Sequence, residues 1–379
     1  MHIRVISSIT EIKAEPWNQL AGTDYPFLRH EFLTALEQSG VVTKTTGWQP
    51  QHLLLYAETE LIAACPLYLK FHSQGEFVFD HQWANAYQQH GLDYYPKALT
   101  AVPFTPCQGQ RILIKTALDE TAVLELFIDA LKQQLIDLKL SSWHCLFSTP
   151  SQTEQLRALG LMVREGVQFQ WFNRGYRDFQ DYIDSFTSRK RKTTLRERQQ
   201  VKNQGIAFLT LNGQSVSEAQ WQVFFQFYQM TYLKHGMPGY LNLDFFKQIA
   251  QSMPEQILLI FAVKDQRYIG AALSFIGNDT LYGRYWGCFE EYQFLHFEAC
   301  YYQGLDYCIA HGLTRFDSGA QGEHKIARGF EPVTTYSAHW IQHPEFAEAI
   351  AQFLEREKST IQQYKADTTV LLPFKKADY

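Results

Sequence analysis

The sequence predicts an α/β protein of two similar domains, and three observations support this fold class. The chain has 379 residues, a length that fits two or three domains. Hydrophobic residues make up 46% and charged residues 19%, which is typical of globular domains with buried cores. The third observation is a repeated order of hairpin, helix and strand, in which the run from Ile62 aligns with the run from Ile269.

The first copy of this order begins with a hairpin predicted over residues 52–69, where two apolar runs flank a short polar turn. A helix is expected at 124–138, because its apolar residues recur on one face, and a strand at 143–147. Residues 70–115 form an insertion between hairpin and helix. We expect a first domain over residues 1–175.

The second copy begins with a hairpin at 258–276, followed by a helix at 297–311 and a strand at 313–316. These elements predict a second domain over residues 206–379, with a connecting segment at 176–205. The two hairpins should therefore occupy equivalent places in two superposable domains.

The insertion in the first half is rich in aromatic side chains. Its three prolines and many rings argue against a regular element and favour a long loop. Ring faces supply contact area and their polar tips supply orientation, so this loop is a candidate substrate pocket. The candidate lining residues are His81, Trp83, Tyr87, Tyr94, Tyr95 and Lys97. The alternative is a surface loop that its aromatic residues hold down.

Residues 188–202 form a strongly basic segment, with seven cations and the single acid Glu197. On a helix, Lys192 and Arg196 share a face and could bind phosphate. The candidate phosphate-binding residues are Arg189, Arg191, Lys192 and Arg196. The alternative is a solvated helix face or a hinge between the two halves.

The stretch 317–331 concentrates polar and charged side chains among glycines, directly after a predicted strand. Glu323 and His324 are residue types that exchange protons near neutral pH. Lys325 and Arg328 lie three apart, and a cation pair on one face can hold a carboxylate or phosphate. The alternative is an ordinary polar loop. Charged residues at a glycine-rich strand end favour the functional interpretation.

Composition excludes several classes of function. The net charge of −5 argues against a polyanion-binding protein as a whole, and no DNA contact is expected. None of the six cysteines forms a Cys-x-x-Cys pair, so no metal site is expected. The apolar run at 257–263 is too short to span a bilayer, and the start of the chain lacks the shape of a signal peptide. We expect a cytoplasmic protein.

Several motifs resemble those of one family. They are Phe79-Asp-His-Gln-Trp-Ala-Asn-Ala-Tyr87, Tyr94-Tyr-Pro-Lys97, Pro103-Phe-Thr-Pro106, Gly109-Gln-Arg111 and Gly319-Ala-Gln-Gly-Glu-His-Lys-Ile-Ala-Arg-Gly-Phe330. In this set the chain resembles the FemAB-like N-acyltransferases over nearly all of its length. The resemblance implies a tandem GNAT (acyl-CoA N-acyltransferase) fold. It also implies a relation to enzymes that add amino acids to peptidoglycan precursors from aminoacyl-tRNA.

The resemblance implies transfer of an acyl or aminoacyl group to the amine of a small molecule or peptide. Glu323 or His324 would take the amine proton, and Lys325 or Arg328 would steady charge. The full set of substrate-binding candidates is His81, Trp83, Tyr87, Tyr94, Tyr95, Lys97, Tyr285, Trp286, Asp317, Gln321 and Arg328. No tightly bound cofactor is expected, and acyl-CoA or aminoacyl-tRNA would serve as co-substrate.

Two departures from the related enzymes bear on the donor. The stretch Arg284-Tyr-Trp-Gly287-Cys-Phe289 keeps two of the three anchors of the GNAT pyrophosphate motif, which weakens the expectation of coenzyme A. Residues 176–205 are too few for the long helical arm that Fem ligases use, which weakens the expectation of tRNA. A non-catalytic peptidoglycan- or peptide-binding module therefore stays open, as does RNA contact through residues 189–202. If the chain is a transferase, we expect the loops at 79–97 and 319–330 to face one shared cleft.

Overall fold

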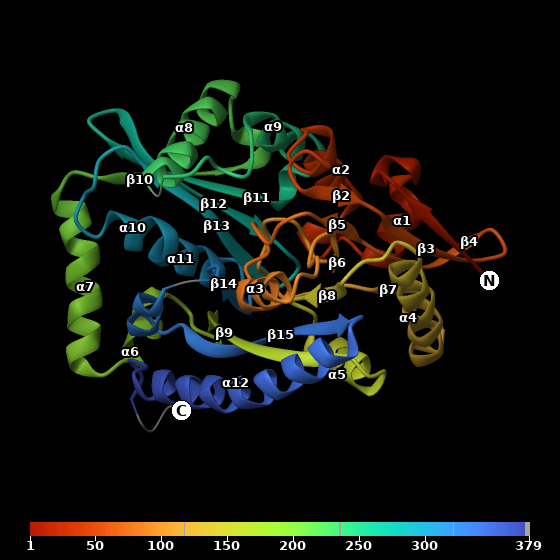
Figure 1. Cartoon of the computed structure of the whole chain (residues 1–379). Helices are drawn as coiled ribbons and strands as arrows, with labels where there is room; N and C mark the ends of the chain where they lie inside the picture. The colour runs from red at the N-terminus through yellow and green to blue at the C-terminus, as the bar shows by residue number, and fades with distance from the viewer. Residues whose placement is uncertain (117, 235, 321, 376–379) are drawn as a thin grey trace. The chain divides into compact units, whose positions relative to one another are not determined.

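A computed structural model describes residues 1–116, 118–234, 236–320 and 322–375 (Figure 1). The chain divides into two compact units. Unit 1 comprises Met1–Val167 and Thr334–Tyr364, and unit 2 comprises Gln168–Val333 and Lys365–Tyr379. Each unit combines β-sheet with flanking helices, as the sequence predicts, and the strands of unit 1 fall in two sheets.

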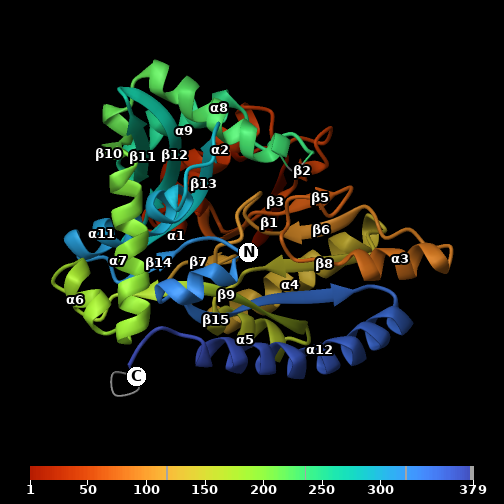
Figure 2. The same ribbon diagram turned by 90° about the vertical axis from the view of Figure 1, so that its left-hand side faces the viewer.

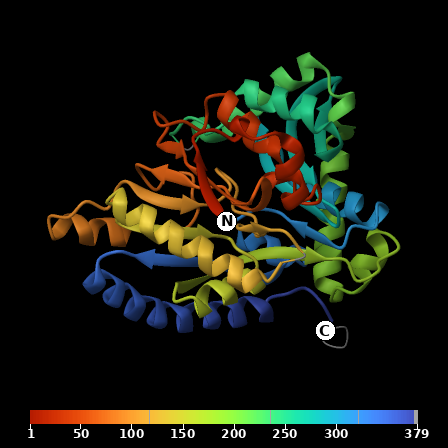
Figure 3. The ribbon, with the colours of Figure 1, turned by 90° about the vertical axis from the view of Figure 1, so that its right-hand side faces the viewer.

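The described residues of unit 1 include strands β1 to β8 and helices α1 to α5. The strands are β1 (His2–Ile6), β2 (Trp48–Pro50), β3 (His52–Ala57), β4 (Glu60–Cys65), β5 (Tyr68–Lys70), β6 (Lys97–Thr100), β7 (Leu113–Ile114) and β8 (Ser142–Leu146). The helices are α1 (Ala14–Ala21), α2 (His30–Gln38), α3 (His81–Gln89), α4 (Glu120–Asp137) and α5 (Pro150–Ala158). Figure 3 shows α4 lying across the strands of this unit, where its apolar face enters the core.

Unit 2 contains the next strands and the helices between them. The strands are β10 (Ala207–Asn212), β11 (Ile257–Lys264), β12 (Arg267–Ile276), β13 (Thr280–Cys288) and β14 (Arg315–Asp317). The helices are α6 (Phe179–Asp184), α7 (Ser188–Asn203), α8 (Glu218–Lys234), α9 (Leu243–Ser252), α10 (Leu295–Phe297), a π-helix (Glu298–Tyr302), α11 (Gln303–Ala310) and the 3-10 helix η6 (Glu323–Arg328). Figure 2 shows α7 as a long helix, which contacts α6 and the π-helix. The basic segment is thus helical over Ser188–Asn203, so the condition for Lys192 and Arg196 to share a face is met.

Three remaining elements have residues in both units: β9 (Met162–Phe172), β15 (Glu331–Ile341) and α12 (Pro344–Val370). In unit 2, the end of β9 pairs antiparallel with β14, with Trp171 opposite Phe316. In unit 1, the end of β15 pairs antiparallel with β8, with Ala338 opposite Cys145. The last strand of each unit therefore comes from the other half of the sequence.

The two units repeat one strand plan, which confirms the predicted duplication. In unit 2, β10, β11, β12 and β13 are antiparallel neighbours, and β13 runs parallel to β14. In unit 1, β1, β3 and β4 are antiparallel neighbours, and β6 runs parallel to β8. The hairpins β3–β4 and β11–β12 thus hold equivalent places. A helix links the two parallel strands in each unit, because a parallel connection has to cross over the sheet.

The structure divides the chain differently from the expected domains 1–175, 176–205 and 206–379. Residues 334–364 belong to unit 1, because β15 completes its sheet and α12 covers its aromatic residues. The segment 176–205 belongs to unit 2 and forms α6 and α7. The prediction assumed that residues close in sequence share a domain. The pairing of β9 in unit 2 and of β15 in unit 1 breaks this assumption, and it has no signal in the local sequence.

The insertion also contains a regular element that the sequence analysis did not predict. Residues His81–Gln89 form α3, and its buried face presents Trp83 and Tyr87 to Ile350 and Leu354 of α12. Burial of large apolar side chains stabilises such a contact by about 1.5–3 kcal/mol for each residue. The prolines on which the loop prediction rested all lie after this helix.

Candidate active site in the second unit

The parallel pair β13–β14 opens into a wedge within unit 2. The two strands pair from Thr280 and Arg315 to Tyr282 and Asp317. Past this point β14 ends, and the chain turns away at Gly319, whose φ of 91° favours glycine. The backbone of β13 beyond Tyr282 is therefore left with one edge open among the described pairings, and a free strand edge can bind an extended ligand through its amides.

A cavity of about 120 Å³, here named the wedge cavity, lies against this edge. Its lining comes from β12, β13, the following helices and the end of β14. The lining residues are Ala272, Leu273, Ser274, Gly283, Arg284, Tyr285, Trp286, His296, Cys300, Tyr301 and Ser318. The structure thus brings the predicted Tyr285 and Trp286 to one cavity with residues that the sequence analysis did not select.

The π-helix forms the helical wall of the wedge cavity and separates it from a second cavity. Tyr301 lines the wedge cavity, while its neighbour Tyr302 lines the other one. At the start of this turn, Glu298 is buried and accepts a hydrogen bond from Nη2 of Arg198 at 2.9 Å. Single π-helical turns occur frequently at functional sites, because they re-aim side chains within a helix.

His324 joins the wedge cavity through Tyr301. Its Nε2 lies 2.8 Å from the hydroxyl oxygen of Tyr301. His324 is exposed as a residue, but partial desolvation of its ring, together with the positive charges of Arg328 and Lys325, lowers the pKa of His324 to about 4. Burial raises the pKa of Tyr301 well above its usual range. At neutral pH the pair is therefore a phenol and a neutral imidazole, and in the tautomer protonated at Nδ1 the phenol donates to Nε2.

His296 completes a triangle of adjacent rings with Tyr301 and His324. Its ring centroid is 5.5 Å from Tyr301 and 5.7 Å from His324. Burial, followed by the charges of the neighbouring His324 and Arg328, lowers the pKa of His296 to about 4. The wedge cavity therefore has two neutral imidazoles beside it at pH 7.

Lys325 and Arg328 are both buried, and the structure ties them to the protein. Nζ of Lys325 donates to the carbonyl oxygen of Gly319 at 2.6 Å, which holds the turn after β14. Nη1 of Arg328 donates to the carbonyl oxygen of His324 at 2.6 Å, and its Nη2 donates to Glu197 at 2.8 Å. The guanidinium also lies 3.4 Å from the ring centre of Phe297. In these contacts both cations position the loop that carries His324.

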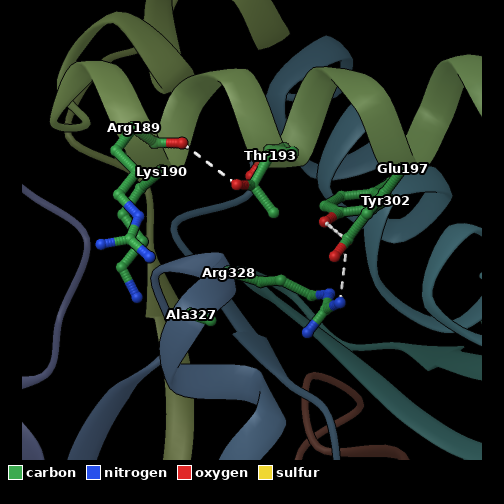
Figure 4. A pocket seen from close by; sticks show the side chains of 8 residues that line it. Arg189, Lys190, Thr193, Glu197, Tyr302, Ala327 and Arg328 are labelled. Carbon is green, nitrogen blue, oxygen red and sulfur yellow. Dashed lines mark hydrogen bonds and ion pairs between the residues drawn. The ribbon is translucent and has the colours of Figure 1, made fainter.

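The second cavity has a volume of about 330 Å³ and lies between the start of α7 and η6 (Figure 4). We name it the α7 cavity. Arg189, Lys190, Thr193, Thr194, Glu197, Tyr302, Ala327 and Arg328 line it. In Figure 4 the side chains of Arg189 and Lys190 extend from α7 toward the turn at Ala327.

The other predicted phosphate ligands do not line the α7 cavity. Arg191 forms an ion pair with Asp184 at 3.0 Å. Lys192 and Arg196 are exposed on other faces of α7. Because the lining of the α7 cavity recurs every three to four residues along the helix, Lys190 lines it and Lys192 does not.

The remaining residues of the 317–331 stretch have separate roles. Asp317 is buried, and its side chain accepts from the amide nitrogen of Gly319 at 3.0 Å and from Nε2 of Gln170 at 3.2 Å. These hydrogen bonds hold the turn after β14. Asp317 does not line the wedge cavity. Glu323 is exposed at the start of η6. Gln321 lies outside the described residues.

Gly287, an anchor of the suspected pyrophosphate motif, has a packing explanation. A Cβ at this position would lie 1.9 Å from the carbonyl oxygen of Phe227 in α8. The glycine lets α8 approach β13 closely. Gly287 is therefore no evidence for a coenzyme A pyrophosphate site.

The aromatic candidates of the first half belong to unit 1, and most are buried there. Trp83, Tyr87 and Tyr94 lie in one apolar cluster with residues of α12. His81 is exposed, and the hydroxyl of half-buried Tyr95 lies 2.7 Å from Oγ of Ser73. That these residues face the 319–330 loop across a cleft stays a prediction.

Lys97 is the most enclosed of the predicted substrate ligands. Its Nζ contacts Asp80 and donates to Glu76 at 2.8 Å. Burial opposes ionisation of Asp80, but the adjacent Lys97 ammonium outweighs it and lowers the pKa of Asp80. Burial raises the pKa of Glu76 to about 7 despite Lys97. The Lys97 ammonium thus forms an internal charge cluster with Asp80 and Glu76.

Sequence reasoning missed Tyr301, Tyr302, His296 and Lys190. The first three fall in a helix whose apolar pattern predicts core residues, and a π-helical turn has no local sequence signal. Lys190 belongs to the basic segment, yet only its helical phase separates it from Lys192.

No group of three or more metal-ligating side chains occurs among the described residues. In the same part of the chain, we find no helix with the length and apolarity that a membrane crossing requires.

Comparison with solved structures supports the fold. FemX aligns with 93% of this chain and 100% of its own, at 13% identity and a TM-score of 0.55. The C-terminal domain of a lysylphosphatidylglycerol synthetase from Agrobacterium fabrum aligns with 90% of this chain and 96% of its own, at 10% identity and a TM-score of 0.55. L-PGS from Bacillus licheniformis aligns with 87% and 97%, at 10% identity and a TM-score of 0.51.

These identities are low enough that the likenesses establish the tandem GNAT-like fold and nothing more. A search of curated proteins by sequence finds no match. The model of the FemAB-like family, described as peptidoglycan biosynthesis/recognition, matches residues 8–376, nearly the whole chain. The chain therefore belongs to the FemAB-like family.

Proposed function

We propose that the protein transfers an acyl or aminoacyl group to the amine of a small molecule or peptide. Membership of a family described as peptidoglycan biosynthesis/recognition supports a peptide-bearing acceptor. The observation that carries the proposal is the hydrogen bond between Tyr301 and His324 at the wall of the wedge cavity. This pair offers a route for the proton that an attacking amine has to lose.

The open edge of β13 supplies the second requirement of the reaction. When an amine attacks the donor carbonyl, the carbonyl oxygen becomes an oxyanion, which backbone amides at a fixed edge stabilise. The edge at Gly283 and Arg284 lines the same cavity as Tyr301, so donor and proton route would lie together. Proximity of this kind accounts for much of the rate advantage of bound reactants.

The proposed proton transfer runs through two side chains. The amine nitrogen bonds to the donor carbonyl carbon and passes its proton to the hydroxyl oxygen of Tyr301. Tyr301 in turn passes its own proton to Nε2 of His324. Collapse of the tetrahedral intermediate breaks the bond to the donor leaving group, which leaves with a proton from Tyr301, and His324 returns its proton to the Tyr301 oxygen. Lys325 and Arg328 keep the loop in place and take no proton.

Substitutions in α11 and at the residue that caps it offer a matched control for a test. Tyr307 and His311 form a second tyrosine–histidine pair in unit 2, with ring centroids 3.9 Å apart, and His311 is exposed outside the wedge cavity. Acyl-CoA thioesters and aminoacyl-tRNA are supplied as donors to a panel of muropeptide amines. Tyr301→Phe and His324→Ala should each lower transfer by about 10²–10⁴-fold. Tyr307→Phe and His311→Ala should leave it unchanged. Retention of activity in both site variants would refute the proposed route.

A non-catalytic peptidoglycan- or peptide-binding module is the second candidate. The packing role of Gly287 favours it, because that glycine no longer argues for a coenzyme A donor. Ligand binding to the native state raises its stability by mass action, so thermal shifts separate the candidates. Stabilisation by acyl donors supports the transferase. Stabilisation by muropeptides alone, without product, supports the binding module.

A further inference from the structure

The α7 cavity carries an excess of positive charge that the proposed transfer does not use. Arg189 and Lys190 enter it from the first turn of α7, and Arg328 enters from η6. Glu197 is the single acid among its lining residues. Neither Arg189 nor Lys190 forms an ion pair with a described residue, so two positive charges remain after Glu197 pairs with Arg328.

The α7 cavity also has room and donors for an anion. Its volume of about 330 Å³ is roughly ten times the ~30 Å³ share of a liquid water molecule. The side chain of Arg328 is only 6% exposed, and its buried Nε lacks a hydrogen-bond partner among the described residues. This N–H is therefore a buried donor without an acceptor. Arginine and lysine side chains bind phosphate through short, charge-assisted hydrogen bonds.

We infer that the α7 cavity binds a phosphate group of a ligand, and that bound phosphate makes His324 a stronger proton acceptor. Arg328 links the two effects, because it lines the α7 cavity and donates to the carbonyl oxygen of His324. Its charge lies next after burial among the causes that lower the pKa of His324. A phosphate beside Arg328 would offset that charge and let the pKa rise.

This inference deepens the proposed function, on which it rests for the use of the proton. With the α7 cavity empty, His324 is a weak base at neutral pH. With phosphate bound, its proton affinity moves toward the ordinary histidine value, where proton transfer is most effective. Coupling between sites is reciprocal, so protonation of His324 should tighten phosphate binding to the same extent.

Two measurements without turnover test the inference. Calorimetry with pyrophosphate gives the affinity of the wild-type chain, of Arg189→Ala and Lys190→Ala, and of the control Lys192→Ala. We expect each of the first two changes to weaken binding about 10-fold and the control to have no effect. Vesicles containing phosphatidic acid form a parallel arm, which distinguishes a lipid phosphate from a soluble one. Since all three residues are at least partly exposed, these variants should fold.

The second measurement follows the imidazole C–H resonance of His324 by NMR, assigned with His324→Gln. Sulfate is the probe, because it keeps its charge across the titration. Saturating sulfate should raise the pKa of His324 by about half a pH unit or more in the wild type, and less in Lys190→Ala. Binding without any rise would overturn the coupling.

Several results would overturn the site itself. The first is equal affinity for pyrophosphate in the wild type and in all variants. The second is no binding of pyrophosphate or of phosphatidic acid vesicles. The third is binding of tRNA that pyrophosphate does not compete away. The transfer assay separately tests the proposed function. Loss of transfer in Tyr301→Phe with normal phosphate binding supports both ideas, whereas normal transfer without phosphate binding refutes this inference alone.

Discussion

Lys97→Met removes the cation at the centre of the internal charge cluster of unit 1. Lys97 is fully buried, contacts Asp80 and donates to Glu76. Removing one partner of a buried ion pair costs about 3–5 kcal/mol, because the other charge is left without compensation. Asp80 would supply most of this cost. Glu76 would supply less, because its pKa of about 7 already allows it to be neutral.

The cost should depend on pH in a defined direction. In the wild type the pKa of Asp80 is lowered, so its pairing stabilises the fold above the unfolded pKa of about 3.9 and loses effect as pH falls through the folded pKa. In the variant, burial without Lys97 should raise the pKa of Asp80. The deficit in free energy of unfolding should therefore shrink as pH falls from 8 to 5.

Guanidinium unfolding followed by tryptophan fluorescence at these two pH values measures the deficit. The double variant Lys97→Met with Asp80→Asn is the matched control, because it leaves no buried aspartate charge. It should be more stable than the single variant at pH 8. A deficit below about 1 kcal/mol in the single variant, or one that does not change with pH, would refute the argument.

Three further predictions concern unit 2. Gly287→Ala should destabilise it by about 1–3 kcal/mol, measured by thermal unfolding, because the new Cβ would lie 1.9 Å from Phe227 O; an unchanged Tm would contradict the packing explanation. The imidazole of His324 should titrate near pH 4 in NMR of the ligand-free chain, because burial and the nearby cations oppose its protonation; a midpoint near 6.5 would be inconsistent with its lowered pKa. Gly329→Ala should reduce transfer, since its Cβ would lie 2.0 Å from Tyr182 Oη and displace η6; wild-type rates would show that η6 tolerates the change.

The duplicated fold was predictable because hairpins and amphipathic helices have local periodic signals. β3–β4, α4 and β11–β12 lie where the apolar patterns place them. The exchange of β9 and β15 was not predictable, since strand pairing over long sequence separation depends on tertiary packing. The same limit explains α3, whose apolar face is meaningful only against α12.

The candidate site was predictable in part. The glycine-rich stretch drew attention to His324, because polar residues after a strand end often carry function, and the role of His324 in transfer stays a prediction. Its partner Tyr301 could not be found, since a tyrosine in an apolar helix usually belongs to the core. Lys325 and Arg328 show the opposite limit: their charges are visible in the sequence, but their hydrogen bonds to Gly319 and His324 are not.

Formation of an N-acylated product is the most direct test of the central claim. The wild-type chain is incubated with muropeptide amines and either acyl-CoA thioesters or aminoacyl-tRNA, and mass spectrometry records the acceptors. We predict an acceptor whose mass has increased by one acyl or aminoacyl group, in wild type and Tyr307→Phe but not in Tyr301→Phe. Unmodified acceptors with every donor, from a protein that binds muropeptides, would contradict the account.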